Sequence, residues 1–168
     1  MSQPATFLNT LYQSHPLFGS LAEGVNHNIT IHLKGLCGSS PALLAASCFV
    51  RLAGVHVIIL PEASAAAYFY NDLCNALEED RVLLFPPSFK RSASQIRTDE
   101  GQLILRTRVQ EFLRQGDPRG GILVTSAEAL GERVLSGEQL GRNILQLHKG
   151  ERISISFICD LLHEYQFT

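Results

Sequence analysis

The 168-residue sequence lacks a large excess of either charge and any long apolar run. Its formal net charge is −2, so the chain as a whole gives no electrostatic reason to bind nucleic acid or an anionic membrane; such binding would need a local basic patch. No stretch approaches the roughly 18 consecutive apolar residues of a membrane span. The first residues lack the basic start and apolar stretch of a signal peptide. These absences predict a soluble, cytoplasmic protein with no membrane partner.

The sequence also lacks a cysteine framework. Its four cysteines stand at positions 37, 48, 74 and 159, and no two of them form a Cys-x-x-Cys pair. No histidine lies at metal-ligand spacing from any of them, so neither a metal site nor a disulfide scaffold is predicted. Cys48 and Cys74 lie within helical apolar patterns and are expected to be buried, reduced thiols. Such cysteine usage is typical of a reducing compartment, which agrees with a cytoplasmic location.

What the sequence does contain is enough apolar material for one well-filled core. Apolar residues make up 45% and charged residues 18%, a balance typical of a globular rather than a disordered chain. The length suits one domain. Helices are predicted at residues 5–24 (as one or two segments, with Pro16 able to open the second), 42–52, 62–77, 102–114, 126–133 and 153–167. Strands are predicted at residues 28–33, 55–60, 81–85, 122–125 and 143–147, and a polar surface loop at 88–100.

This alternation of strands and helices predicts right-handed βαβ units, and therefore a three-layer α/β fold in which helices cover both faces of a parallel sheet. The apolar run at 55–60 is expected to be buried on both faces of the sheet. The predicted core residues are Leu44, Val57, Ile58, Ile59, Leu84 and Val124. The predicted organisation is N-terminal helices at 1–28, a domain of the P-loop NTPase or helicase type at 29–148, and at 149–168 the first helix of a second, small α+β domain.

The loop after the first predicted strand is where such a fold binds phosphate, at the start of a helix. Laid on the pattern G-x-x-x-x-G-K-[ST], Gly35 keeps the first glycine, but Ser40, Pro41 and Ala42 replace the second glycine, the lysine and the hydroxyl residue. Without the lysine no side chain neutralises the phosphates, and without the hydroxyl Mg²⁺ loses a protein ligand. The degenerate loop comprises Gly35, Gly38, Ser39, Ser40, Pro41 and Ala42. It is expected to form a tight turn that binds no cofactor.

Two enzymatic interpretations stay open beside this one. The first is a nucleotide-binding hydrolase that uses an unusual loop. The second is a nucleophile elbow, because residues 38–42 (GSSPA) approximate G-x-S-x-G without the final glycine. The candidate partners of Ser40 are poorly placed in the sequence, since Asp72 and Asp160 fall inside predicted helices and neither His148 nor His163 has a loop setting typical of a triad. His32 and His56 are interpreted as satisfied residues of the core or of a sheet face, so the favoured interpretation has no catalytic and no metal-binding residue.

A small basic cluster in the 88–100 segment is the other candidate site. Lys90, Arg91 and Arg97 stand beside Phe89 with no acidic residue between them. A solvated surface accounts for such a cluster, because nucleic-acid grooves normally carry denser charge, but an anion or partner contact is the alternative. Together with Tyr165 on the last predicted helix, these three residues are the candidate partner contacts.

Four stretches taken together resemble one known family. They are residues 34–46 (KGLCGSSPALLAA), 59–73 (ILPEASAAAYFYNDL), 84–91 (LFPPSFKR) and 121–130 (GILVTSAEAL). In this order they resemble the N-terminal region of the bacterial transcription-repair coupling factor, which is itself similar to the excision-repair helicase UvrB. The resemblance covers about residues 29–168 without large gaps.

The resemblance implies that catalytic parts are missing here. UvrB carries a complete phosphate loop, whereas the coupling-factor family has a degenerate one, as at Ser40, Pro41 and Ala42 of this chain. UvrB also carries a tyrosine-rich hairpin that clamps damaged DNA, and residues 86–95 are too short and have no tyrosine to form one. The resemblance therefore implies neither ATP turnover nor a DNA clamp in this segment.

The resemblance also implies a role and partners. A coupling factor recognises RNA polymerase stalled at a lesion, displaces it with an ATP-driven DNA motor, and recruits UvrA through its UvrB-like module. The expected partners are UvrA and the other domains of the same full-length protein, while RNA polymerase and DNA are contacted through parts outside this sequence. The surface for UvrA lies mainly in the small domain of which only the first helix, at about 154–167, is expected here. The sequence is thus expected to be one piece of a longer protein.

Overall fold

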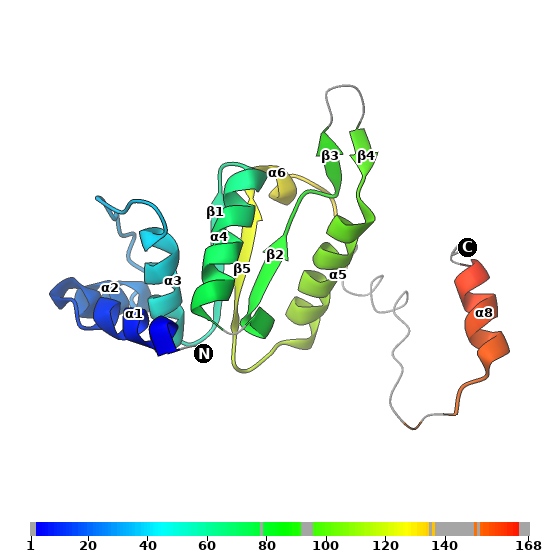
Figure 1. The fold of residues 1–168 in the computed structure, drawn as a ribbon, viewed down its shortest axis with the longest axis horizontal. Coiled ribbons are helices and arrows are strands. Elements are labelled where there is room, and N and C mark those ends of the chain that lie inside the picture. Colours follow the sequence, from blue (N-terminus) through cyan, green and yellow to red (C-terminus); the bar gives the residue numbers. More distant parts are fainter. Residues whose placement is uncertain are drawn as a thin grey trace. The chain divides into compact units, whose positions relative to one another are not determined.

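The computed structural model describes residues 3–77, 79–91, 96–134, 136, 150 and 152–164. The chain divides into two compact units, residues 1–134 and 135–168. The first unit contains a parallel sheet of three strands, in the order β1 (Val55–Leu60), β5 (Gly121–Ser126) and β2 (Val82–Phe85), with β5 in the middle (Figure 1). These strands are rich in β-branched and aliphatic residues, which suit a pleated, buried surface.

Helices cover both faces of this sheet, as the alternation of elements predicts. On one face, α4 (Ala63–Ala76) packs over the strands and α3 (Ser40–Arg51) packs beside α4. Their cluster includes Leu73, Ile122 and Val124. On the other face, α5 (Glu100–Gln115) packs on β2, and a second cluster forms around Leu83 and Val109. Successive residues of β5 and β2 alternate between the two clusters because strand side chains have a period of two. The coarse α/β prediction is confirmed for a small sheet.

Two N-terminal helices precede this layer, and Pro16 opens the second, so the two-segment alternative of the prediction is the one observed. They are α1 (Gln3–Gln13) and α2 (Pro16–Asn26), and α1 packs against α3. Proline suits the first turn of a helix, where its missing N–H would have no partner. Two hydrogen bonds join α1 to α3: Ser47 Oγ donates to Asn9 Oδ1 over 3.1 Å, and Gln13 Nε2 donates to the Ser47 carbonyl over 3.2 Å.

The strand predicted at 28–33 is wrong. These residues form no regular structure, and the alternating Ile29, Ile31 and Leu33 are all exposed. The end of α2 holds the segment instead, because the Ile29 N–H bonds to the Gly24 carbonyl over 2.9 Å and Asn28 adopts a positive φ of 55°. Alternation of apolar and polar residues does not by itself produce a strand, because a neighbouring strand must be present to form the hydrogen bonds of the ladder.

The prediction that β1 is buried on both faces is also wrong. Val57 is 52% exposed and Ile59 is 57% exposed. In the described part of the chain β1 pairs only with β5, so it lies at the edge of the sheet, and α5 covers β2 rather than β1. Among the other predicted core residues, Val124 is fully buried, while Leu44, Ile58 and Leu84 are half-buried.

Two further predictions need correction, and one lies outside the described residues. The predicted 88–100 loop contains a hairpin of β3 (Phe89–Arg91) and β4 (Ile96–Thr98). The helix predicted at 126–133 is shorter, since α6 spans Ala127–Leu130 and the chain turns at Gly131. The hairpin was not predicted because backbone hydrogen bonds hold its two strands together and do not require apolar side chains. Polar strands of this kind show little hydrophobic periodicity in the sequence. The strand predicted at 143–147 lies outside the described residues.

The second unit contains α8 (Ile155–Glu164), which confirms a helix within the predicted range 153–167. Its residues Ile155 and Phe157 are exposed. Tyr165 lies outside the described residues, and the domain boundaries at 28 and 148 stay predictions. Across the residues that the structure describes, none of the helices has the length and apolar character needed to cross a bilayer.

Candidate functional site

The degenerate phosphate loop is an exposed turn that satisfies its own hydrogen bonds. Gly35 and Gly38 adopt positive φ values of 82° and 56°, which favour glycine. The Cys37 N–H donates to Ser40 Oγ over 2.8 Å, and the Ser40 N–H donates to the Cys37 carbonyl over 3.1 Å. The N–H groups of Cys37 and Ser40 are therefore occupied inside the loop, and Pro41 has none to offer a phosphate.

The surroundings of this loop differ from both enzymatic templates. A nucleophile elbow and a phosphate loop each sit between a strand and a helix, and the segment before Gly35 is not a strand. Ser39 precedes α3 and Ala42 is buried within it, so neither replaces the missing lysine or magnesium ligand. Within the described ranges, no group of three or more His, Cys, Asp or Glu side chains is placed to hold a metal ion.

The histidines and acids considered for catalysis lie in other settings. His56 is half-buried on β1, where its ring packs edge-on against Phe49 with centroids 5.3 Å apart and its Nε2 lies 3.3 Å from the Leu52 carbonyl. Burial lowers the pKa of His56, and the Leu52 contact partly offsets this. His32 lies in the exposed irregular segment rather than on a sheet face. His56 therefore has a packing role.

The remaining candidates are spread over different elements. Asp72 lies on α4, whereas Asp160 and His163 lie on α8 of the second unit. His148 lies outside the described residues.

The basic cluster lies on the β3–β4 hairpin. Lys90 of β3 stands directly opposite Arg97 of β4, and Arg91 is the neighbour of Lys90 along the strand. Like charges opposite each other across a two-stranded ladder destabilise it. The hairpin therefore places two basic residues opposite each other in the backbone register.

The base of this hairpin is fixed by a buried ion pair that the sequence analysis missed. Arg106 of α5 is 5% exposed; its Nη1 lies 3.2 Å from Glu132 Oε2 and donates to the Pro86 carbonyl over 2.8 Å. The Glu132 carboxylate accepts the Ser88 N–H at 3.0 Å. Burial lowers the pKa of Arg106, and the charge of Glu132 raises it. The signal that could have revealed this residue is an arginine three positions before Val109, on the apolar side of its helix.

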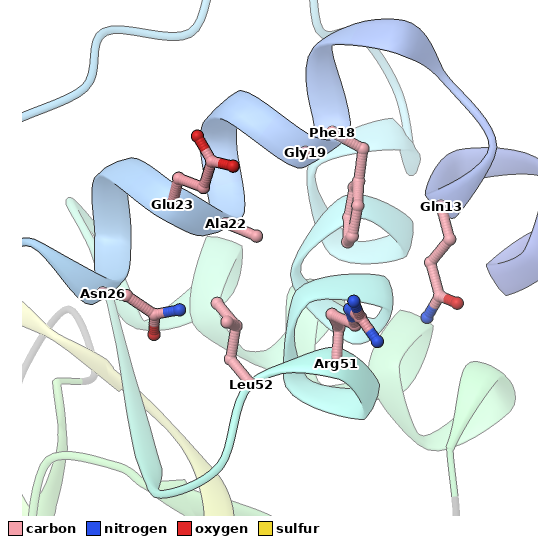
Figure 2. A pocket seen from close by; sticks show the side chains of 8 residues that line it. All are labelled: Gln13, Phe18, Gly19, Ala22, Glu23, Asn26, Arg51 and Leu52. Atoms are coloured by element: carbon pink, nitrogen blue, oxygen red, sulfur yellow. The ribbon is translucent and has the colours of Figure 1, made fainter.

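A cavity of about 530 Å³ lies between α2 and the end of α3 (Figure 2). It was not predicted, because its walls come from segments far apart in the sequence. Phe18 and Leu52 form apolar walls, and Arg51, the last residue of α3, reaches toward Phe18 and Gln13. A second cavity of about 410 Å³ shares Arg51 and Leu52.

Comparison with known proteins gives no match to a family model, to a curated protein or to a solved structure. The proposals below depend on the residues and geometry of this chain.

Proposed function

We propose that this chain is a non-catalytic, UvrB-like module of a transcription-repair coupling factor. In this role it forms part of the scaffold that recruits UvrA to RNA polymerase stalled at a DNA lesion. The full-length protein would be an ATP-dependent DNA translocase whose motor lies elsewhere. The non-catalytic part of the proposal depends on the closed loop, which is the degenerate phosphate loop with its internal hydrogen bonds. In this loop Ser40 Oγ accepts a hydrogen bond from the Cys37 N–H, and Pro41 has no N–H to offer.

The arrangement of the resembling stretches supports the family proposal. Residues 34–46 form the closed loop and the start of α3, and residues 59–73 form the end of β1 and most of α4. Residues 84–91 join the end of β2 to β3, and residues 121–130 are β5 and α6. Each stretch thus leads into the next element from a strand or from the loop. The connections that follow the carboxyl ends of strands are where α/β folds usually carry their functional residues.

The hairpin and the second unit are the proposed contact regions of this module. Lys90, Arg91 and Arg97 lie on a hairpin whose base is held by Arg106 and Glu132, so their positions at the backbone level are defined. The family carries its UvrA surface mainly in the following small domain. The hairpin is therefore proposed to contact UvrA only at the edge of that surface, or to contact another domain of the same protein.

The first prediction concerns ATP. We expect Mg·ATP to leave the melting temperature of this chain unchanged, because the loop has no lysine, no hydroxyl for Mg²⁺ and no open N–H at Cys37 or Pro41. Pro41→Lys should show no hydrolysis, since the metal ligand is still absent. Scanning calorimetry and a phosphate-release assay measure both. If the chain were a nucleotide-binding hydrolase with an unusual loop, ATP at a hundredfold excess over its Kd would raise the free energy of unfolding by about 2.7 kcal/mol.

The second prediction concerns UvrA. A version that continues through the following small domain should bind purified UvrA in a pull-down or calorimetric titration, and the present chain should bind it at least tenfold more weakly. Neutralising the hairpin with Lys90→Gln, Arg91→Gln and Arg97→Gln should weaken binding further, whereas Arg108→Gln on the exposed side of α5 should not. Failure of both versions to bind would reject the family proposal.

A further inference from the structure

The cavity of Figure 2 is a preformed space with fixed walls. Phe18 and Leu52 are themselves buried, so their positions are set by packing. Gly19 and Ala22 are small and leave the space open beside the Phe18 ring. Gln13, at the end of α1, is held by its hydrogen bond to the Ser47 carbonyl. A cavity with such walls loses little entropy when it is filled.

Arg51 supplies this cavity with an uncommitted positive charge. In Figure 2 its guanidinium points toward the Phe18 ring and the Gln13 amide. Within the part of the chain that the structure describes, the side chain of Arg51 forms no hydrogen bond and no ion pair. A guanidinium is a rigid fork of donors that matches a carboxylate with two parallel hydrogen bonds. An anion in the cavity would give Arg51 the partner that it lacks.

The second cavity that Arg51 borders adds positive rather than negative charge. The neighbouring cavity is lined by Arg51, Arg81 and Arg119 and by no carboxylate. Two acids beside Arg119 are already committed to it: Asp117 Oδ2 lies 2.8 Å from its Nη2 and Asp80 Oδ2 lies 3.7 Å from its Nη1. Hydrogen bonds from Arg119 hold the pKa of Asp117 below its usual value. Neither acid is therefore available to Arg51.

The other polar groups of the cavity are compatible with an organic anion. Glu23 lies on the α2 wall, but its carboxylate is turned away from Arg51 (Figure 2). The Asn26 amide extends toward Leu52 and can donate to a second oxygen of a ligand. Phe18 and Leu52 are largely buried, and the small part of each that borders the cavity is apolar, so a ligand that also carries an apolar group can contact it.

We propose that this cavity binds a carboxylate that carries an adjacent apolar group, with Arg51 holding the carboxylate and Phe18 and Leu52 contacting the apolar part. The same chemistry is present in a free aryl or alkyl carboxylate and in the carboxyl-terminal residue of a peptide. The site is independent of the UvrB-like role and of the loop at residues 35–42.

The test is a titration followed by the backbone amide resonances of Phe18, Ala22 and Leu52. The probes are phenylacetate for the free source and N-acetyl-Gly-Phe for the peptide source, each compared with its uncharged carboxamide. Saturable shifts are expected with the carboxylates, and at least tenfold weaker binding with the amides, because one charge-assisted contact is lost. Whichever carboxylate binds more tightly identifies the source.

Variants of Arg51 provide the matched controls. Arg51→Gln should weaken binding by tenfold or more, and Arg51→Lys should restore part of it, because it keeps the charge but loses the fork. Arg108→Gln should bind like the unmodified chain. No saturable shift in the unmodified chain, equal binding of acid and amide, or unchanged binding in Arg51→Gln would each overturn the proposal. The acid-to-amide comparison needs no variant, so it holds even where a substitution impairs folding.

Discussion

Replacing Leu73 by alanine is expected to lower the free energy of unfolding by about 3 kcal/mol. Leu73 on α4 is 0% exposed and belongs to the cluster that joins α4 to Val82, Ile122 and Val124 of the sheet. Its side chain is fully buried in this cluster, so the surrounding helix and strands can close only part of the space left by the missing atoms. The cost therefore includes both lost burial and a residual cavity.

Leu113→Ala on α5 is the matched control for this prediction. Leu113 is 53% exposed, and alanine is at least as good a helix former, so the change should stay within about 0.5 kcal/mol. Urea unfolding followed by circular dichroism measures both variants, and the slope with denaturant should not change between them. Equal losses in the two variants would show that α4 is not packed on the sheet as described.

The elements that could be predicted from the sequence are those whose own residues decide them. The helix α4 and the strand β1 follow from periodicity and from Gly54 and Pro61, which bound β1. The central position of β5 agrees with the apolar run at residues 122–124, because a strand covered on both faces favours apolar side chains. The buried Thr125 of this strand satisfies its hydroxyl by donating to the Phe85 carbonyl over 2.8 Å.

The elements that could not be predicted depend on neighbours. The runs at 28–33 and 55–60 both resemble strands, yet the first has no partner in the ladder and the second lies at the sheet edge. Val57 and Ile59 are apolar in sequence and exposed in the structure for that reason. Periodicity reports which side chains share a face, but whether that face is covered depends on the packing of distant elements.

The candidate sites divide in the same way. The chemical deficiency of the loop was predictable because it depends on residue type at Ser40, Pro41 and Ala42. The hydrogen bond from the Cys37 N–H to Ser40 Oγ, which closes the loop further, needed the structure. Arg51 in the cavity depends on contacts between segments more than twenty residues apart, which no local pattern encodes.

The second large effect is expected at Arg106. Arg106→Met keeps an unbranched apolar stem but removes the guanidinium that Glu132 and the Pro86 carbonyl contact. The same guanidinium lies 4.1 Å above the centre of the Phe85 ring. Removal of one member of a buried ion pair is strongly destabilising, because the remaining charge is desolvated and uncompensated. The expected loss in the free energy of unfolding is about 3 kcal/mol.

A double-mutant cycle separates this cause from simple loss of packing. Glu132→Gln keeps an oxygen for the Ser88 N–H while removing the charge, so Arg106→Met combined with Glu132→Gln should cost less than the sum of the single changes, by about 1 kcal/mol or more. Arg108→Met, at an exposed site two residues along the same helix, should change stability by less than about 0.5 kcal/mol.

The same variant has a local consequence that distinguishes a fixed hairpin base from a general loss of stability. The Asp99 N–H bonds to the Ser88 carbonyl at the base of the hairpin, and the Ser88 N–H bonds to Glu132. Amide hydrogen exchange at these two positions should accelerate in Arg106→Met more than at Val124 in the core, because the base opens without global unfolding. Uniform acceleration at all three positions, together with an additive cycle, would show that Arg106 stabilises the whole unit and does not specifically hold the segment that presents Lys90 and Arg97.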